Sequence, residues 1–395
     1  MTTRTRQALL PNTANSCLGI LGGGQLGRMF THAAQALGYK VVVLEPEANC
    51  PTAQVAELHI QADYQDPAAL AELARMTQAV TTEFENVPAQ SLQQLAHSGF
   101  VAPAAAGVAI AQDRLAEKAF FTRCGAQTGV YPAPHQALHS AADLANVNSD
   151  LFPAILKTAR MGYDGKGQFR VRDAAELAAA YQQTGAQVCV LEKMLPLAYE
   201  VSVLVARGVD GQAVVYPIAE NEHRDGILHI TLVPSPNLSA EIASKAQQAA
   251  LTIIAELDYV GVLCIEFFVL QDGSLVVNEM APRPHNSGHY TIDACSANQF
   301  EQQVRALAQL PLAEVRLHSP AAMLNLLGDL WFDGEQERSP AWDKLLALPG
   351  THLHLYGKAE ARVGRKMGHL TITAASMAEV RQTLAQACEI LGIAL

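Results

Sequence analysis

The sequence has few of the features that mark membrane, secreted or nucleic-acid-binding chains. No apolar run approaches the roughly 20 residues that a membrane helix requires. The seven cysteines are irregularly spaced and include no C-x-x-C pair, which does not fit a disulfide framework. The net charge of -11 argues against nucleic acid as a partner, because phosphate backbones attract clustered lysine and arginine. We therefore expect a cytoplasmic protein with reduced thiols and with neither membrane nor nucleic acid as a partner.

The chain is long enough to form more than one hydrophobic core. Its 395 residues, half of them hydrophobic, predict a globular protein of two to three domains. Residues 1–16 have no long apolar stretch and are expected to form a flexible tail. The succession of apolar runs and turn residues then predicts domains over 17–113, 114–314 and 315–395, with a small glycine-loop unit at about 125–195 inside the second.

The N-terminal pattern predicts a strand–helix–strand unit with ligand-binding loops. A short apolar run precedes Gly22-x-Gly24-x-x-Gly27, and a second run ends at Glu45, which satisfies the dinucleotide-binding fingerprint. Three interpretations stay open: NAD binding, binding of another phosphorylated ligand at the helix N-terminus, and a structural tight turn. Glu83 follows a later strand, at the edge where open parallel sheets place their ligands.

A second glycine loop lies in the predicted second domain. Lys157 ends a strand, and Gly162, Gly165 and Gly167 would let backbone N–H groups approach phosphates. The loop is not a P-loop, because Gln168 follows Gly167 where that motif has lysine. The alternative is a flexible hairpin tip.

Two acidic residues lie within apolar strands. Glu266 lies in the run 262–268, Glu279 ends the run 275–279, and the turn at Asp272-Gly273 predicts a hairpin that makes them neighbours. Two carboxylates side by side repel each other unless a cation intervenes, and Mg²⁺ prefers such oxygen ligands. The alternative is a pair of ordinary salt bridges.

Cationic residues gather in two later segments of this acidic chain. Arg283 and His285 lie in a proline-stiffened loop, where the arginine is suited to bidentate contact with a phosphoryl or carboxylate group. The second group is either solvated surface charge or an anion site, such as a ribose-phosphate pocket, and consists of Lys358, Arg362, Arg365 and Lys366.

Together these motifs resemble the N5-carboxyaminoimidazole ribonucleotide synthetase family, from residue 17 to about 371. The N-terminal glycine loop, Gly22–Gly27, is the least specific segment. The most specific is Asn278-Glu279-Met280-Ala281-Pro282-Arg283-Pro284-His285-Asn286-Ser287-Gly288-His289. The resemblance implies α/β and α+β architecture: an ATP-grasp fold with an N-terminal Rossmann-like domain and a small C-terminal β-rich domain. The departures are the N-terminal tail and Met194-Leu195, where the family often has phenylalanine and valine.

The resemblance also assigns residues to ligands. For ATP it implies Arg114, Lys157, Gly162, Tyr163, Asp164, Gly165, Lys166, Gly167, Gln168, Glu192, Lys193, Met194, Leu195, Glu200, His223, Asn278 and Glu279. For aminoimidazole ribonucleotide it implies Gly24, Gln25, Leu26, Glu83, Tyr163, Asp164, Arg283, His285, Lys358 and Arg365. Glu266 and Glu279 resemble magnesium ligands, and the catalytic residues implied are Asp164, Arg283, His285 and Lys358.

The implied activity is that of an ATP-dependent carbon–nitrogen ligase in de novo purine biosynthesis. ATP would phosphorylate bicarbonate to carboxyphosphate, and the amine of aminoimidazole ribonucleotide would take up the carboxyl group, leaving ADP and phosphate. ATP and Mg²⁺ are the expected cofactors, and the resemblance suggests a homodimer.

Three other functions are considered. A formate-using ATP-grasp ribonucleotide transformylase shares the early motifs. An NAD-dependent oxidoreductase would use the first glycine loop but leaves Gly162–Gln168 and the pair Glu266 and Glu279 unexplained. A non-catalytic nucleotide-binding protein would not turn over ATP.

Overall fold

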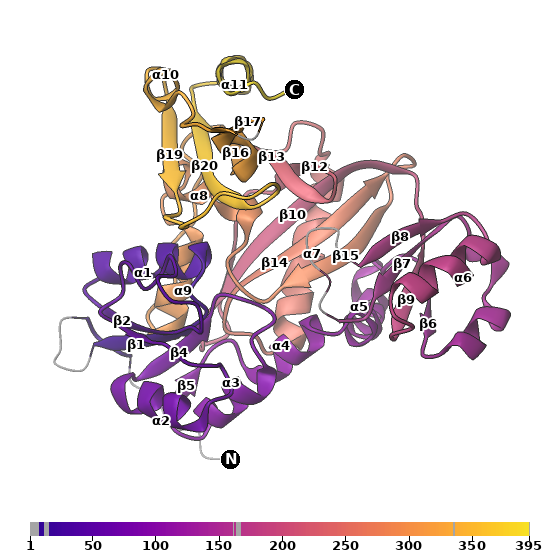
Figure 1. Ribbon diagram of the computed structural model, residues 1–395, viewed down its shortest axis with the longest axis horizontal. Helices are drawn as coiled ribbons and strands as arrows, with labels where there is room; N and C mark the ends of the chain where they lie inside the picture. The colour runs from indigo at the N-terminus through magenta and orange to yellow at the C-terminus, as the bar shows by residue number, and fades with distance from the viewer. Residues whose placement is uncertain (1–7, 12–15, 161, 163–166, 335, 395) are drawn as a thin grey trace.

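The computed structural model describes residues 8–11, 16–160, 162, 167–334 and 336–394. Figure 1 shows an N-terminal layer of strands and helices, a small unit at the far side, and a central sheet that extends up to the C-terminal strands. In the described part of the chain, no helix combines the length and the apolar character that crossing a bilayer demands.

The N-terminal sheet is parallel, and its strand order reverses between two of its inner strands. Its strands lie in the order β3-β2-β1-β4-β5 and are β1 (Cys17–Leu21), β2 (Lys40–Leu44), β3 (Leu58–Ile60), β4 (Ala79–Thr82) and β5 (Phe100–Val101). The helices are α1 (Gln25–Ala36), α2 (Pro67–Met76), α3 (Ala89–Ala96) and α4 (Ala105–Ala111). The order reverses between β1 and β4, so the loops after Leu21 and Thr82 open at a topological switch point, where such sheets bind ligands.

Part of the expected flexible tail is packed against this domain. The backbone N–H of Leu9 donates to the carbonyl of Ala308 at 2.9 Å, and the hydroxyl of Tyr39 donates to the carbonyl of Leu9. Leu9 also packs against the core between the sheet and its covering helices. The expectation of a flexible tail is therefore wrong for residues 8–11.

The small unit is an antiparallel sheet covered by one long helix. Its strands lie in the order β6-β9-β7-β8 and are β6 (His135–Leu138), β7 (Ala154–Thr158), β8 (Gln168–Val171) and β9 (Cys189–Lys193). Helix α6 (Ala174–Gln183) packs on it, and the turns η1 (Ala141–Asn146) and η2 (Ser149–Leu151) close its edge.

Helix α5 (Arg114–Thr128) leads into this unit. The side chain of Asp113 caps its first turn, and the helix continues past Gly125 and stops at Gly129 with φ +69°. A Cβ on Gly125 would lie 2.5 Å from the ring of Tyr131, so this glycine allows close packing and does not end the helix.

The large sheet joins the second and third predicted domains. Its strands lie in the order β15-β14-β10-β12-β13-β16-β20-β19, with β11 against β10, and each pairing within it is antiparallel. They are β10 (Leu197–Arg207), β11 (Ala213–Val215), β12 (Ala219–Arg224), β13 (Ile227–Val233), β14 (Gly261–Leu270), β15 (Leu275–Ala281), β16 (Ala321–Leu327), β19 (Thr351–Leu355) and β20 (Lys366–Thr373). Strands β16, β20 and β19 therefore continue the central sheet, whereas β17 (Phe332–Asp333) and β18 (Gln336–Glu337) form a separate two-stranded sheet.

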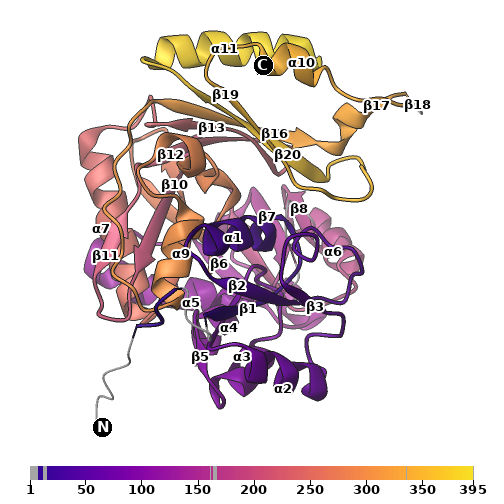
Figure 2. The same ribbon diagram turned by 90° about the vertical axis from the view of Figure 1, so that its left-hand side faces the viewer.

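The remaining helices cover this sheet on opposite sides. Helix α7 (Ala240–Glu256) packs with α5 against β10 and β14, and α9 (Gln299–Leu307) lies between β14 and the N-terminal domain. Figure 2 shows α11 (Met377–Leu391) lying across the outer side of the C-terminal strands. The short elements are η3 (Asn286–Gly288), α8 (Thr291–Ala294), η4 (Gly328–Trp331), β17 (Phe332–Asp333), β18 (Gln336–Glu337) and α10 (Trp342–Leu346).

Candidate active site

The first glycine loop binds a carboxylate of the protein itself. The N–H groups of Gly24 and Gly27 donate to Glu83 at 2.5 and 2.6 Å, and the N–H of Gly23 donates to Glu45 at 2.6 Å. Burial raises the pKa of Glu83, although the hydrogen bonds from the N–H groups of Gly27 and Gly24 lower it. The backbone groups that a dinucleotide pyrophosphate would use are thus engaged by carboxylates, which argues against the NAD interpretation.

Arg283 connects this loop region to the large sheet. It follows β15, and its Nε forms an ion pair with Glu85, which lies just after Glu83 in the loop that follows β4. Burial opposes the charge on both partners, but the guanidinium holds the pKa of Glu85 below its ordinary value. Glu85 was not predicted as a site residue, although it lies two positions from Glu83.

The expected nucleotide residues form ion pairs with one another. Arg114, at the start of α5, contacts Glu279 with 2.9 Å between Nη1 and Oε2, and it donates to the carbonyl of Gly162 at 3.3 Å. Lys157, at the end of β7, contacts Glu192 on β9 at 3.0 Å. Burial opposes the charge of Arg114, but Glu279 raises the pKa of its guanidinium.

His223 and Glu200 form a further ion pair in this set. They lie on β12 and β10, and 2.9 Å separates Nδ1 from Oε2. Burial alone would lower the pKa of His223, but Glu200 raises it.

A buried lysine that was not predicted from the sequence links β9 to β15. Lys118 is 1% exposed, and its Nζ lies 3.3 Å from the carboxylate of Glu192 and 2.9 Å from the carbonyl oxygen of Asn278. Burial would raise the pKa of Glu192, but Lys118 and Lys157 hold it at about 2. The available signal was the four-residue spacing from Arg114, which places both cations on one face of α5.

Glu117 was missed as well. Its side chain is buried and accepts a hydrogen bond from the N–H of Met280 at 2.8 Å, beside Glu279. Burial raises the pKa of Glu117 to about 8. It fixes the backbone of β15 next to the expected metal ligands.

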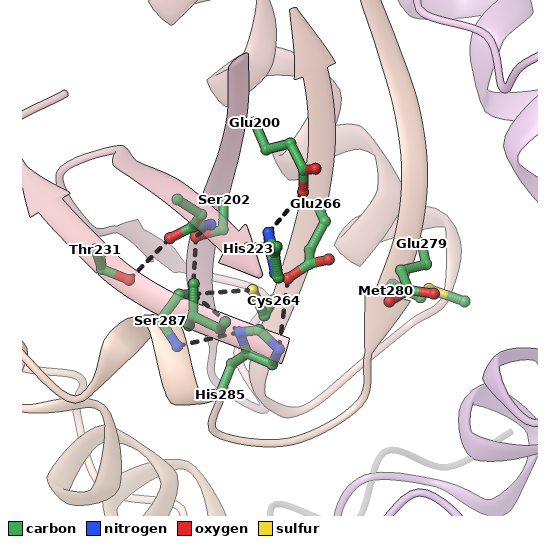
Figure 3. Close-up of polar contacts among 12 residues, drawn as sticks. Glu200, Ser202, His223, Thr231, Cys264, Glu266, Glu279, Met280, His285 and Ser287 are labelled. Atoms are coloured by element: carbon green, nitrogen blue, oxygen red, sulfur yellow. Dashed lines mark hydrogen bonds and ion pairs between the residues drawn. The ribbon is translucent and has the colours of Figure 1, made fainter. Parts of the chain in front are cut away.

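The two expected metal ligands face each other across the predicted hairpin. Glu266 on β14 is the cross-strand partner of Glu279 on β15, and Figure 3 shows both carboxylates on the same side of these strands. Burial and then Glu279 raise the pKa of Glu266 to about 7. Burial opposes ionisation of Glu279 too, but Arg114 holds its pKa below the ordinary value.

This donor set fits Mg²⁺. The amide oxygen of Asn278, the residue before Glu279, is buried and has no hydrogen-bond partner among the described residues, so it is a further oxygen not used by the protein. Within those residues no group of three His, Cys, Asp or Glu side chains could hold a metal ion, so the remaining ligands would come from phosphates and water. The alternative salt bridge also occurs at Glu279, which contacts Arg114, whereas Glu266 lies 3.6 Å from the ring of His285.

The C-terminal cations lie on the loop between β19 and β20, which contacts the N-terminal domain. The side-chain amide of Gln54 donates to the carbonyl of Gly357 at 2.7 Å. Lys358 donates to the carbonyl of Lys366 at 2.6 Å, and Arg365 donates to the carbonyl of Glu360 at 2.9 Å. Figure 1 shows the lower ends of β19 and β20 above α1.

The other expected site residues lie around these groups. Gln25 and Leu26 begin α1 directly after Gly24, and Gly167 leads into β8 with φ +72°. Gln168 starts β8 opposite Lys157, and Lys193, Met194 and Leu195 follow Glu192 along the chain. The expectations for Tyr163, Asp164, Gly165 and Lys166 fall outside the described residues.

Comparison with known proteins assigns the family. Three family models match in succession: the ribonucleotide synthetase preATP-grasp domain over 16–112, the ATP-grasp domain over 124–300, and the phosphoribosylaminoimidazole carboxylase C-terminal domain over 321–383. The N5-carboxyaminoimidazole ribonucleotide synthase of Brucella melitensis is 45% identical over 358 residues, which cover 90% of this chain and 96% of the relative. This chain belongs to the N5-carboxyaminoimidazole ribonucleotide synthase family.

Other members of the N5-carboxyaminoimidazole ribonucleotide synthase family agree. The Bacillus subtilis enzyme is 39% identical over 370 residues, with 93% of each chain covered. A solved synthetase of the family in its ADP complex has a TM-score of 0.88 at 39% identity, covering 98% of both chains. The Aspergillus clavatus synthase, solved with ADP and 5-aminoimidazole ribonucleotide, has a TM-score of 0.85 at 31% identity, covering 96% of this chain and 99% of that one.

These likenesses confirm two predictions from the sequence. The fold is an ATP-grasp fold with an N-terminal Rossmann-like domain and a β-rich C-terminal domain, and the family is the one that the motifs resemble. As a member of the synthase family, the chain is an ATP-dependent ligase.

Proposed function

We propose that this ligase uses ATP to join bicarbonate to the amine of 5-aminoimidazole ribonucleotide, giving N5-carboxyaminoimidazole ribonucleotide, ADP and phosphate for purine biosynthesis. One observation carries the proposal. Arg283 and His285 lie two residues apart on one loop, and they face different halves of the site: Arg283 pairs with Glu85 beside the glycine loop, and His285 lies 3.6 Å from Glu266. In this proposal the loop would join the ribonucleotide site to the nucleotide site.

The first step is phosphoryl transfer to bicarbonate. A bicarbonate oxygen attacks the γ-phosphorus of ATP, the bond to the bridging oxygen breaks, and ADP leaves, so that carboxyphosphate forms. The negative charge that develops on the transferring group needs fixed cations. Arg114 and Lys157 are placed for this role, because each is held in position by a buried or half-buried carboxylate.

The second step is carbon–nitrogen bond formation. The amine nitrogen of the ribonucleotide attacks the carboxyl carbon, the bond from carbon to the phosphate oxygen breaks, and the amine loses one proton. Asp164 is our candidate to accept that proton, from its place in the family motif. Arg283 and Lys358 would stabilise the anionic groups that pass between the two steps.

The donor chemistry supports Mg²⁺ as the metal. Glu266 and Glu279 would hold it, with the amide oxygen of Asn278 beside them. When bound, Mg²⁺ neutralises phosphate charge and orients the triphosphate. Glu279 would then exchange Arg114 for the metal, which leaves the guanidinium available for the nucleotide.

We also propose the ligand assignments and the assembly that the family resemblance implies. Glu83, Arg283, His285, Lys358 and Arg365 would bind the ribonucleotide. Support comes from the loop of Lys358 and Arg365, which contacts the N-terminal domain through Gln54. A homodimer is the expected assembly, and sedimentation of the whole chain tests it.

The decisive experiment measures phosphate release from ATP with Mg²⁺ and bicarbonate, with and without 5-aminoimidazole ribonucleotide. We expect release to depend on the ribonucleotide, and equal rates in its presence and absence would reject the function. Replacing bicarbonate by formate separates the ligase from a transformylase. With ¹⁸O-labelled bicarbonate, label in the released phosphate supports carboxyphosphate, and unlabelled phosphate excludes it.

A further inference from the structure

Behind His285 lies a chain of buried polar side chains that the proposed reaction does not use. It runs from Thr231 on β13 through Asn221 on β12 and Ser202 on β10 to Ser287 in η3, and Figure 3 shows it ending on the His285 ring. Thr231, Ser202 and Ser287 are fully buried and Asn221 is 6% exposed. Buried polar groups that are all satisfied fix one arrangement of their neighbours.

Each hydrogen bond in this chain has its direction set by the bond before it. The hydroxyl of Thr231 donates to Oδ1 of Asn221 at 2.9 Å, which turns the amide nitrogen toward Ser202. That nitrogen donates to Oγ of Ser202 at 2.9 Å, so the hydroxyl proton of Ser202 is left to donate to Oγ of Ser287 at 2.8 Å. The proton of Ser287 then points at Nδ1 of His285, 2.9 Å away, because its other neighbour, Sγ of Cys264 at 3.9 Å, is the more distant and weaker acceptor.

A second donor reaches the same nitrogen. The backbone N–H of Ser287 donates to Nδ1 of His285 at 3.3 Å. Two donors on Nδ1 leave no place for a proton there, so the neutral ring carries its proton on Nε2. The backbone of His285 is also held on both sides, because the Gln299 side chain accepts from its N–H and donates to its carbonyl, each at 2.8 Å.

We propose that Thr231, Asn221, Ser202 and Ser287 are positioning residues that hold His285 as the Nε2–H tautomer, so that His285 donates a hydrogen bond into the site and does not act as a base through Nε2. The role of His285 in catalysis rests on the proposed function, but the tautomer does not. Nε2 faces Oε1 of Glu266, the expected metal ligand, where the transferred phosphate and carboxylate oxygens would gather. An N–H donor there binds developing negative charge, whereas a bare nitrogen would repel it.

The direct test is the ¹⁵N spectrum of the whole protein labelled at its histidine rings, with His285→Asn used to assign the resonances of His285. We expect a pyridine-type Nδ1 and a pyrrole-type Nε2 in the wild type. Ser202→Ala should add some of the Nδ1–H tautomer, because the hydroxyl of Ser287 then becomes free to accept from the ring, and only the longer backbone N–H contact at 3.3 Å still favours the Nε2–H form. A pyrrole-type Nδ1 in the wild type would overturn the proposal.

Three variants separate orientation from folding. Thr231→Val removes the donor that orients the Asn221 amide while keeping the side-chain shape, and Thr231→Ser restores it. Ser91→Ala is the matched control, because Ser91 is equally buried and its hydroxyl has no partner among the described residues. We expect Thr231→Val, but neither Thr231→Ser nor Ser91→Ala, to alter the ¹⁵N spectrum of His285.

Kinetics give a second readout in the ribonucleotide-dependent assay. Ser202→Ala should lower kcat by about tenfold while the KM for ATP stays unchanged, because the lost donor acts on the transition state and not on ATP binding. An unchanged kcat together with an unchanged tautomer would refute the positioning role. If the wild type itself shows no ribonucleotide-dependent turnover, the proposed function fails, and the spectrum still decides the tautomer.

Discussion

The carboxylate of Glu83 accepts hydrogen bonds from the backbone N–H groups of Gly24 and Gly27, and so lies at the N-terminus of α1 where many α/β proteins bind a phosphate. The backbone N–H groups of this turn, which could bind a phosphate, thus hold the side chain of Glu83 in place. Held in this way at the end of β4, the carboxylate has a fixed position.

Gly24→Ala should displace the carboxylate of Glu83 from this turn. A Cβ at Gly24 would lie 2.6 Å from Oε1 of Glu83, so the carboxylate has to move. We expect the KM for the ribonucleotide to rise by about tenfold, the equivalent of about 1.4 kcal/mol, with ATP affinity unchanged. Gly99→Ala is the control, because its nearest neighbour would lie at 3.7 Å. Steady-state kinetics that show equal KM values for the two variants would contradict the role of Glu83.

Arg365→Ala should weaken ribonucleotide binding and spare ATP. Charge-assisted hydrogen bonds to a phosphate contribute about 1.5–3 kcal/mol, so we expect the KM for the ribonucleotide to rise about ten- to a hundredfold. ATP titrated by equilibrium binding provides the comparison on the same variant. Weaker ATP binding with an unchanged ribonucleotide KM would place Arg365 in the nucleotide site instead.

Glu279→Gln should abolish turnover while the fold persists. The change removes one ligand charge from the proposed Mg²⁺ site and one partner from Arg114. Loss of one electrostatic contact of about 4 kcal/mol corresponds to a rate reduction on the order of 10³. The exposed Glu389 supplies a control in Glu389→Gln. Near-normal activity at saturating Mg²⁺ would show that Glu279 is only a partner of Arg114.

Lys118→Met should destabilise the protein more than a surface substitution of the same kind. Lys118 shares the carboxylate of Glu192 with Lys157, and breaking a buried ion pair typically costs about 3–5 kcal/mol. Urea unfolding of Lys118→Met against Lys344→Met, at an exposed position, measures the difference. Equal free energies of unfolding would mean that the lysine contributes no net stability.

The same carboxylate predicts a dependence of stability on pH. The pKa of Glu192 in the folded protein is about 2, below its ordinary value of 4.5. A depressed carboxyl pKa stabilises the fold above the ordinary value, and that stabilisation is lost as the pH falls toward the folded value. We therefore expect Glu192→Gln to be less stable than the wild type near neutral pH and the gap to narrow below pH 4.5. A gap that widens in acid would contradict the assignment.

Local chemistry made much of the fold predictable from the sequence. The β14–β15 hairpin follows from two apolar runs on either side of the turn at Asp272-Gly273, and its register puts Glu266 opposite Glu279 as predicted. Strand β12 was not predicted, because it carries Glu220, Glu222, His223 and Arg224 and lacks the apolar alternation of a half-buried strand. Its partners in the sheet, and not its own sequence pattern, determine its structure.

The site was predictable where motifs are contiguous and not where it depends on packing. The family motifs indicated Arg114 and Glu279 as site residues. Their contact joins residues 165 positions apart, and no local sequence pattern predicts it. Lys118 was missed because charged side chains on a helix are usually solvated. Only the position of α5 against β15 and β9 explains why this one is buried.

The C-terminal segment cannot be treated as a detachable module. Strand β13 is hydrogen-bonded to β12 on one side and to β16 on the other. A chain cut after α9 would leave that second edge bare, with a row of unpaired backbone groups beside apolar side chains, and such edges invite other chains to add to the sheet. Exchange of the last segment between relatives would therefore have to preserve the pairing of β13 with β16, because this pairing both covers the edge of β13 and holds the loop between β19 and β20 in place.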